Sequence, residues 1–247
     1  MTYEHIDSLL ARMRTDLKAL AAANDARRFF HATYLRTTRA VADELARGGF
    51  ADGDWVEHWD LVFADLYLDA LEADLRGQPV TAPWRVAFDT ARDQPDIQPL
   101  RHVLFGLNAH INFDLPQALV AVISSAEFAD PEALARREAD HLHLDTVLQS
   151  RVRAEDAELG AVSKVTIFDR LIRPANRAAS RRLLAEARSK VWRNAKALDA
   201  ARLAGEARYA AVLAELERRC AARVSELTAP GPVLLTLARR GFGVLLP

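Results

Sequence analysis

Apolar side chains recur at intervals of three and four residues along almost the whole chain, which is the spacing of one face of an α-helix. Ile6, Leu9, Met13 and Leu20 set this pattern near the start. No stretch alternates apolar and polar residues for long enough to predict a sheet. Half of the 247 residues are hydrophobic, and Ala, Leu and Arg, which lose little freedom in a helix, dominate. The sequence therefore predicts an all-α fold, a single multi-helix bundle with a long C-terminal helix pair.

Glycine and proline divide this pattern into segments. We expect helices over residues 2–22, 25–47, 55–76, 84–92, 99–125, 131–153, 163–174 and 176–226. Asp54 is the expected N-cap of the third helix, Pro116 should end or kink the central one, and Gly205 should bend the last. Residues 125–131 are expected to be a linker.

Residues 233–247 are apolar apart from two arginines and are expected to form a short helix packed on the body. The expected organisation is one domain over residues 1–247. A division into a site-bearing bundle, 1–155, and long helices with an apolar tail, 156–247, stays open.

Charge and composition exclude several classes of function. The 33 basic and 34 acidic residues give a net charge of −1, so no global field favours nucleic acid. No apolar run reaches the ~18 residues of a membrane span, and we do not expect the first residues to be a signal peptide, because they lack a basic and an apolar stretch. Cys220, the one cysteine, lies in a helical run and is expected to be a packed thiol. We expect a cytoplasmic protein with a small-molecule ligand or substrate, and a homodimer is left open.

Familiar catalytic motifs are absent from the sequence. It contains no Gly-x-Gly-x-x-Gly, no P-loop, no Gly-x-Ser-x-Gly and no cysteine-based zinc motif. Di-iron bundles carry a Glu-x-x-His motif on each of two helices, and this sequence has a single one, Glu138 with His141. These absences argue against nucleotide-fold enzymes and serine hydrolases.

The strongest candidate site lies in the middle of the chain, on an apolar helix. Asn108, His110, Asn112 and Asp114 fall within seven residues of that helix. A spacing of four places Asn108 beside Asn112 and His110 beside Asp114. Four polar side chains on an apolar helix are costly to bury unless each has a partner. They indicate either a catalytic or metal site, or a buried hydrogen-bond network that fixes helix register. Gly106 is expected to allow close approach.

Further candidate ligands come from other predicted helices. His141 and Asp145 have the same four-residue spacing as His110 and Asp114, so the two pairs could bind one metal ion together. Asp65 lies on an apolar helix and is expected to point inward, toward a metal or an arginine. The residues His31, Trp84 and Trp192 are interpreted as parts of the core.

Three strings of the sequence resemble an uncharacterised, mainly actinobacterial family of helical proteins of unknown function. They are residues 63–71, 84–88 and 106–116, and the string Asn-Ala-His-Ile-Asn-Phe-Asp-Leu, which begins at Asn108, is the most specific. The resemblance covers most of the chain. It implies membership of that family and its helical fold, but no activity.

A looser likeness concerns zinc-dependent phospholipase C and the related single-strand nucleases. Those helical bundles hold zinc with His-x-x-x-Asp on one helix and His-x-x-x-Glu on another, and His110/Asp114 and His141/Asp145 are similar to these pairs. Pro116 follows Asp114 as a proline follows the zinc-binding aspartate there. The histidine after that proline is replaced by Gln117, and the N-terminal tryptophan ligand is absent.

These observations leave three hypotheses for the function. The first is a metal-dependent phosphoester hydrolase in which His110, Asp114, His141, Asp145 and Asp65 bind zinc. The second is a metal-free enzyme of small-molecule metabolism with His110 as acid or base, oriented by Asp114, and with Asn108 and Asn112 lining the pocket. The third is a non-enzymatic binding or scaffold protein.

Overall fold

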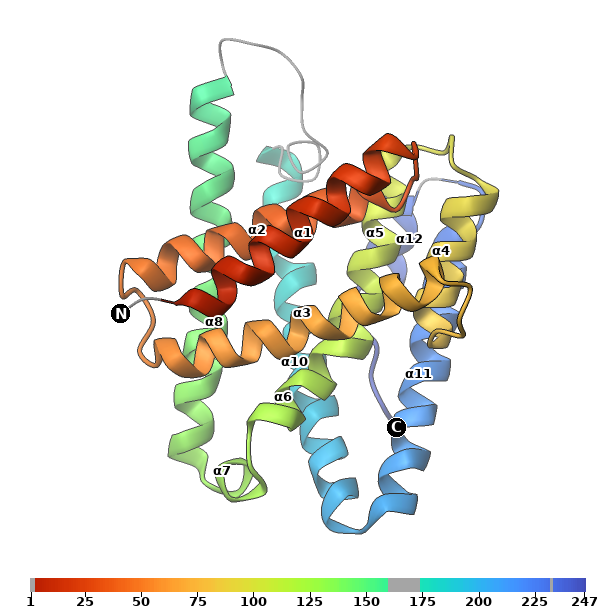
Figure 1. Cartoon of the computed structure of the whole chain (residues 1–247). Helices are drawn as coiled ribbons and strands as arrows, with labels where there is room; N and C mark the ends of the chain where they lie inside the picture. Colours follow the sequence, from red (N-terminus) through yellow and green to blue (C-terminus); the bar gives the residue numbers. More distant parts are fainter. Residues whose placement is uncertain (1–2, 160–173, 232) are drawn as a thin grey trace.

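The computed structural model of the chain describes residues 3–159, 174–231 and 233–247 (Figure 1). These described residues form helices joined by short turns, and they contain no β-strand. The predicted all-α class is therefore confirmed. Across the described ranges, no helix is both long enough and apolar enough to cross a membrane.

The first part of the chain forms four helices: α1 (Glu4–Ala22), α2 (Arg28–Ala46), α3 (Gly53–Leu75) and α4 (Ala82–Asp93). Glycines follow two of them in the left-handed region, Gly48 after α2 at φ 68° and Gly77 after α3 at φ 69°. The predicted cap of α3 was wrong by two residues. Asp52, not Asp54, accepts a hydrogen bond from the backbone N–H of Trp55, at 3.1 Å.

The middle of the chain forms α5 (Pro99–Ala109), the π-helix η1 (His110–Asp114), α6 (Leu115–Val122), α7 (Ser125–Ala129) and α8 (Pro131–Leu159). The linker expected over residues 125–131 is wrong, because α7 occupies most of it. Ser124 begins α7 with a capping box: its hydroxyl accepts from the N–H of Glu127, and the Glu127 carboxylate accepts from the N–H of Ser124.

The C-terminal part forms α10 (Pro174–Leu203), α11 (Glu206–Thr228) and α12 (Val233–Arg240). The helical pattern over 176–226 is divided at Gly205, which at φ 116° lies in a turn between two packed helices, so the predicted long C-terminal helix pair is confirmed (Figure 1). A side chain at this φ is strained, and glycine avoids that cost. The helix predicted over 163–174 lies almost wholly outside the described residues.

The central helix, α5–η1–α6, lies between two layers of helices. Helices α2 and α3 pack on one side of it, and α10 and α11 pack on the other (Figure 1). Buried apolar residues from both parts of the chain join one hydrophobic core, among them Trp59, Trp84 and Trp192. Polar side chains on the central helix are consequently shut off from solvent on both faces. The division into domains stays a prediction.

Gly106 confirms the expectation of a close approach on the central helix. A Cβ atom added to Gly106 would overlap the ring of Phe30, which comes from α2. The α2–α5 contact therefore depends on glycine at this position.

We predict that Gly106→Ala lowers the free energy of unfolding by about 2 kcal/mol, because overpacking outweighs the ~1 kcal/mol that alanine gains in a helix. Urea denaturation of the wild type and the variant measures the change. The same substitution in a Phe30→Leu background should cost less. An equal cost in both backgrounds would show that the Phe30 ring is not the cause.

Candidate functional site: a buried histidine and aspartate

The candidate site begins with an irregularity in the central helix. The N–H of Leu115 donates to the carbonyl of His110, five residues back, as in a π-helix. Pro116 has no N–H to donate to the carbonyl of Asn112, and its ring crowds that carbonyl. We attribute the wider turn to this proline. The helix does not end at Pro116 but continues as α6. Such π-bulges are frequent at functional sites.

His110 and Asp114 face each other across this turn, as their spacing predicted. The Nδ1 atom of His110 lies 2.9 Å from Oδ2 of Asp114, and both side chains are at most 3% exposed. The same Oδ2 accepts a hydrogen bond from the indole N–H of Trp84, at 2.9 Å. A carboxylate with two donors has a fixed orientation, and it fixes the orientation of the imidazole in turn.

Five aromatic rings surround His110, and we call them the aromatic cage: Phe30, Tyr34, Phe63, Tyr67 and Trp84. The Phe63 ring is stacked on the imidazole, with centroids 3.7 Å apart and planes 4° from parallel. Tyr34 meets it edge to face at 4.5 Å. Pairs four residues apart on α2 and α3 supply four of the rings, so regular helix geometry places them around one point.

Burial sets the protonation state of the pair. It lowers the pKa of His110 below the ordinary 6.5, although Asp114 opposes part of that change. It also raises the pKa of Asp114, against the hydrogen bonds from His110 and Trp84. With the proton of the neutral ring on Nδ1, facing Asp114, the lone pair of His110 is on Nε2. This nitrogen is the basic atom of the site.

Several buried polar atoms near the cage lack a hydrogen-bond partner within the part of the chain that the structure describes. They include Nε2 of His110 and Oδ2 of Asp60, whereas the hydroxyls of Tyr34 and Thr38 face each other. Burial, followed by the Asp60 and Asp114 carboxyls, raises the pKa of Tyr34, so its hydroxyl keeps its proton. Buried polar groups without partners are rare in native proteins and commonly mark a site for water or a ligand.

The two asparagines of the motif lie on the opposite face of the same helix. Asn108 and Asn112 both donate from Nδ2 to the carbonyl of Phe242, at 3.1 and 3.0 Å. They therefore share a face, as predicted, but they bind the C-terminal residues instead of lining the aromatic cage. Their observed role is the buried hydrogen-bond network that the sequence left open.

The second histidine pair does not join the first in any described contact. His141 is buried, accepts a hydrogen bond at Nδ1 from the indole N–H of Trp192 at 2.8 Å, and packs against Trp59. Burial and the nearby Arg188 lower its pKa to about 3. The side chain of Asp145 lies outside the described residues. Among the side chains that are described, no three His, Cys, Asp or Glu groups are arranged to hold a metal ion.

The expectation that Asp65 points inward was wrong. Its side chain is 59% exposed and lies 3.7 Å from the guanidinium of Arg12 on α1. Asp60, five residues earlier on α3, is the buried carboxyl at 3% exposure. Periodicity could not separate the two, because α3 is apolar on most of its circumference.

Two other residues, which the sequence predicts to be buried, have structural roles in the core. His31 donates from Nε2 to the carbonyl of Met13 at 2.8 Å and accepts at Nδ1 from the Tyr67 hydroxyl at 2.9 Å. Cys220 is buried, and burial, with Asp114 nearby, raises the pKa of its thiol. A thiol in this state is a poor nucleophile.

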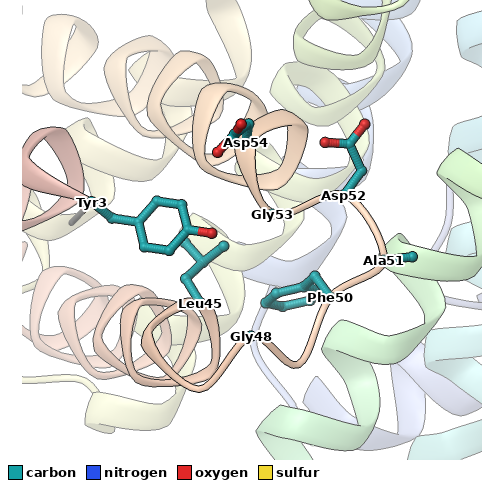
Figure 2. Close-up of a pocket in the computed structure, with 8 residues that line it drawn as sticks. All are labelled: Tyr3, Leu45, Gly48, Phe50, Ala51, Asp52, Gly53 and Asp54. Atoms are coloured by element: carbon teal, nitrogen blue, oxygen red, sulfur yellow. The ribbon is translucent and has the colours of Figure 1, made fainter. Parts of the chain in front are cut away.

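A surface hollow of about 270 Å³ lies away from the candidate site, at the turn between α2 and α3 (Figure 2). None of the predicted site residues lines it. Its walls are Tyr3, Leu45, Gly48, Phe50, Ala51, Asp52, Gly53 and Asp54. Asp52 already caps α3 and lies 2.6 Å from the guanidinium of Arg137.

Sequence reasoning missed three residues of the site: Trp84 as a donor to Asp114, Tyr34 as a ring against His110, and Asp60 as the buried acid. Each comes from a helix that the sequence does not place beside the central one. The signal that was available is the i, i+4 aromatic pair Phe30 and Tyr34, repeated by Phe63 and Tyr67.

The fold and site define an all-α protein with a buried histidine–aspartate pair inside an aromatic cage. A model of the family described as "Family of unknown function (DUF5995)" matches residues 6–230. This match covers most of the chain, so the protein belongs to that family. Comparisons with curated proteins and with solved structures found no match.

The buried acid Asp60 leads to a prediction on pH. Burial raises its pKa from 3.8 to about 7, so the folded protein keeps a proton that the unfolded chain releases between these values. Stability attributable to Asp60 therefore falls as pH rises through this window. We predict that Asp60→Asn raises the free energy of unfolding at pH 8, by up to about 4 kcal/mol, and much less at pH 4.

Urea denaturation of both proteins across this pH range measures the difference. Asp69→Asn, at an exposed position of the same helix, is the control and should leave the pH dependence nearly unchanged. A gain from Asp60→Asn that is equal at pH 4 and pH 8 would contradict a raised pKa.

Proposed function

We propose that the protein is a metal-free enzyme of small-molecule chemistry, in which Nε2 of His110 exchanges a proton with its substrate. The observation that carries this proposal is the geometry of the imidazole. Nδ1 is held by Asp114, whereas Nε2 is buried without a partner among the described residues. A histidine oriented by a carboxylate, with its other nitrogen free, is the usual form of a general acid or base.

The surroundings of His110 indicate the class of substrate. Ring faces and edges surround the imidazole, and such surroundings favour a small, uncharged and largely aromatic or apolar molecule over a charged one. The carboxyl of Asp60 offers a hydrogen bond to the polar end of such a molecule. Asp114 stabilises the imidazolium that forms when His110 takes up a proton.

A second candidate is the zinc-dependent phosphoester hydrolase. One observation favours it: a metal-bound histidine commonly donates its other ring N–H to a carboxylate, as His110 is placed to do toward Asp114. His110 Nε2 would then be a ligand, with His141 and Asp145 as proposed partners. Metal analysis of the purified protein separates the two candidates, because only the hydrolase retains zinc.

Binding of phenol and toluene tests whether Nε2 accepts a hydrogen bond. We predict that the wild type binds phenol about tenfold more tightly than toluene, since a hydrogen bond to Nε2 contributes about 1 kcal/mol or more. His110→Gln should reduce this ratio. His102→Gln, at a buried histidine that stacks on Phe29 outside the cage, is the control and should keep it.

The spectrum of bound p-nitrophenol tests the acceptor role of Nε2, because the absorption band of the phenol moves to longer wavelength when its hydroxyl donates a strong hydrogen bond. We predict this shift with the wild type and not with His110→Gln. The bound phenol should stay protonated, and the shift should persist below pH 6.5, since burial lowers the pKa of His110 and keeps the ring neutral. Equal spectra with both proteins would contradict a basic role for His110.

A further inference from the structure

The residues after α12 are held as if they were a bound peptide. Residues 241–247, here called the C-terminal segment, form no helix and run between the central helix and α11 (Figure 1). Residues 242–244 and Leu246 are buried, whereas Leu245 is partly exposed. The segment is therefore enclosed by its neighbours along most of its length.

Two asparagine side chains pair with the backbone of the C-terminal segment. Asn112 donates to the carbonyl of Phe242 at 3.0 Å and accepts from the N–H of Val244 at 3.0 Å. Asn194, on α10, donates to the carbonyl of Val244 at 2.9 Å and accepts from the N–H of Leu246 at 2.9 Å. Each amide therefore uses a donor and an acceptor, as a neighbouring strand would.

Charged side chains complete this pairing. Glu186 accepts from the N–H of Gly243 at 3.1 Å, and Lys190 donates to the carbonyl of Gly243 at 3.1 Å. Arg223 donates to the carbonyl of Gly241 at 2.7 Å, and Arg219 to that of Leu245 at 3.3 Å. We call the set that contacts the backbone the tail site: Asn108, Asn112, Glu186, Lys190, Asn194, Arg219 and Arg223.

The tail site selects its peptide by shape. A Cβ atom at Gly243 would lie 2.9 Å from the Cα of Ala187, which is backbone and cannot move aside. Gly241 has φ 76°, a conformation that favours glycine. The preferred ligand is thus an extended peptide with small residues at 241 and 243 and apolar residues at 242, 244 and 246. The chain's own C-terminal segment fits this pattern, and any other copy of the chain carries the same segment.

We infer that the tail site binds the C-terminal segment of a second copy of this protein, so that two chains exchange residues 233–247. The exchanged contacts are the same as those within one chain, and only the link through Ala229, Pro230 and Gly231 changes its path. Exchange of an identical element is a low-cost route to a dimer. The effective concentration of the attached segment sets the equilibrium between the monomer and the exchanged dimer, and for a short link it is on the order of millimolar. The tail site lies within the part matched by the family, whereas the segment lies beyond residue 230.

A complementation experiment tests this exchange. Val244→Pro removes the N–H that Asn112 binds and leaves a chain with an intact tail site but a disabled segment. The double variant Asn112→Ala, Asn194→Ala has an intact segment and a disabled tail site. Light scattering after size exclusion should give a monomer for each variant alone and a 1:1 complex of twice the mass for the mixture.

Matched controls use side chains that face away from the contact. Leu245→Ala keeps every backbone hydrogen bond of the segment, and Lys196→Ala, an exposed position on α10, keeps the tail site. Their mixture should remain largely monomeric. If folded variants of the first pair stay monomeric when mixed, the proposed exchange is wrong.

The wild type provides a second measurement that does not depend on the folding of the variants. Its dimer fraction should rise as protein concentration approaches the millimolar range, and an excess of synthetic peptide 241–247 should return it to the monomer. The same peptide with proline in place of Val244 should have no effect. Absence of a dimer at millimolar concentration, or a dimer that the peptide does not dissociate, would overturn the inference.

Discussion

The structure depends on the burial of one apolar helix, which carries several polar side chains, between two layers of helices. Helix α5–η1–α6 has α2 and α3 on one side and α10 and α11 on the other, so none of its inner side chains reaches water. Each buried polar group there needs a partner or costs stability. Asp114 is satisfied by His110 and Trp84, and Asn112 by the C-terminal segment. Among the described residues of this helix, Nε2 of His110 and Oδ1 of Asn108 are among the buried polar atoms that lack a hydrogen-bond partner, and the proposed chemistry begins with Nε2 of His110.

The buried central helix has two faces with different partners. His110 and Asp114 face the aromatic cage of α2, α3 and α4, while Asn108 and Asn112 face the C-terminal segment. The four polar residues are neighbours in the sequence, but they point in pairs to opposite sides of the helix. On the first face Nε2 of His110 is free, and on the second the amide of Asn112 both donates to and accepts from the C-terminal segment, while Oδ1 of Asn108 has no partner among the described residues.

Local patterns in the sequence predicted much of the fold. Helical spacing gave the all-α class, and the turns at Gly48 and Gly77 followed from residue preferences. The i, i+4 rule correctly paired His110 with Asp114 and Asn108 with Asn112. Long-range features could not be derived in this way. Nothing near Trp84 indicates that its indole binds Asp114, and periodicity on the apolar helix α3 placed Asp65 inside, where Asp60 lies instead. The turn at Gly205 needed the knowledge that α10 and α11 pack against each other.

The central claim is that His110 is neutral, with its proton on Nδ1 and a free lone pair on Nε2. Nitrogen NMR of protein labelled in its histidines tests this claim most directly, with His110→Gln used to assign the signal. We predict that Nδ1 of His110 is protonated and Nε2 is not, and that this state persists below the ordinary histidine pKa of 6.5. A proton on Nε2 at neutral pH, or a His110 that titrates at the ordinary value, would contradict the account.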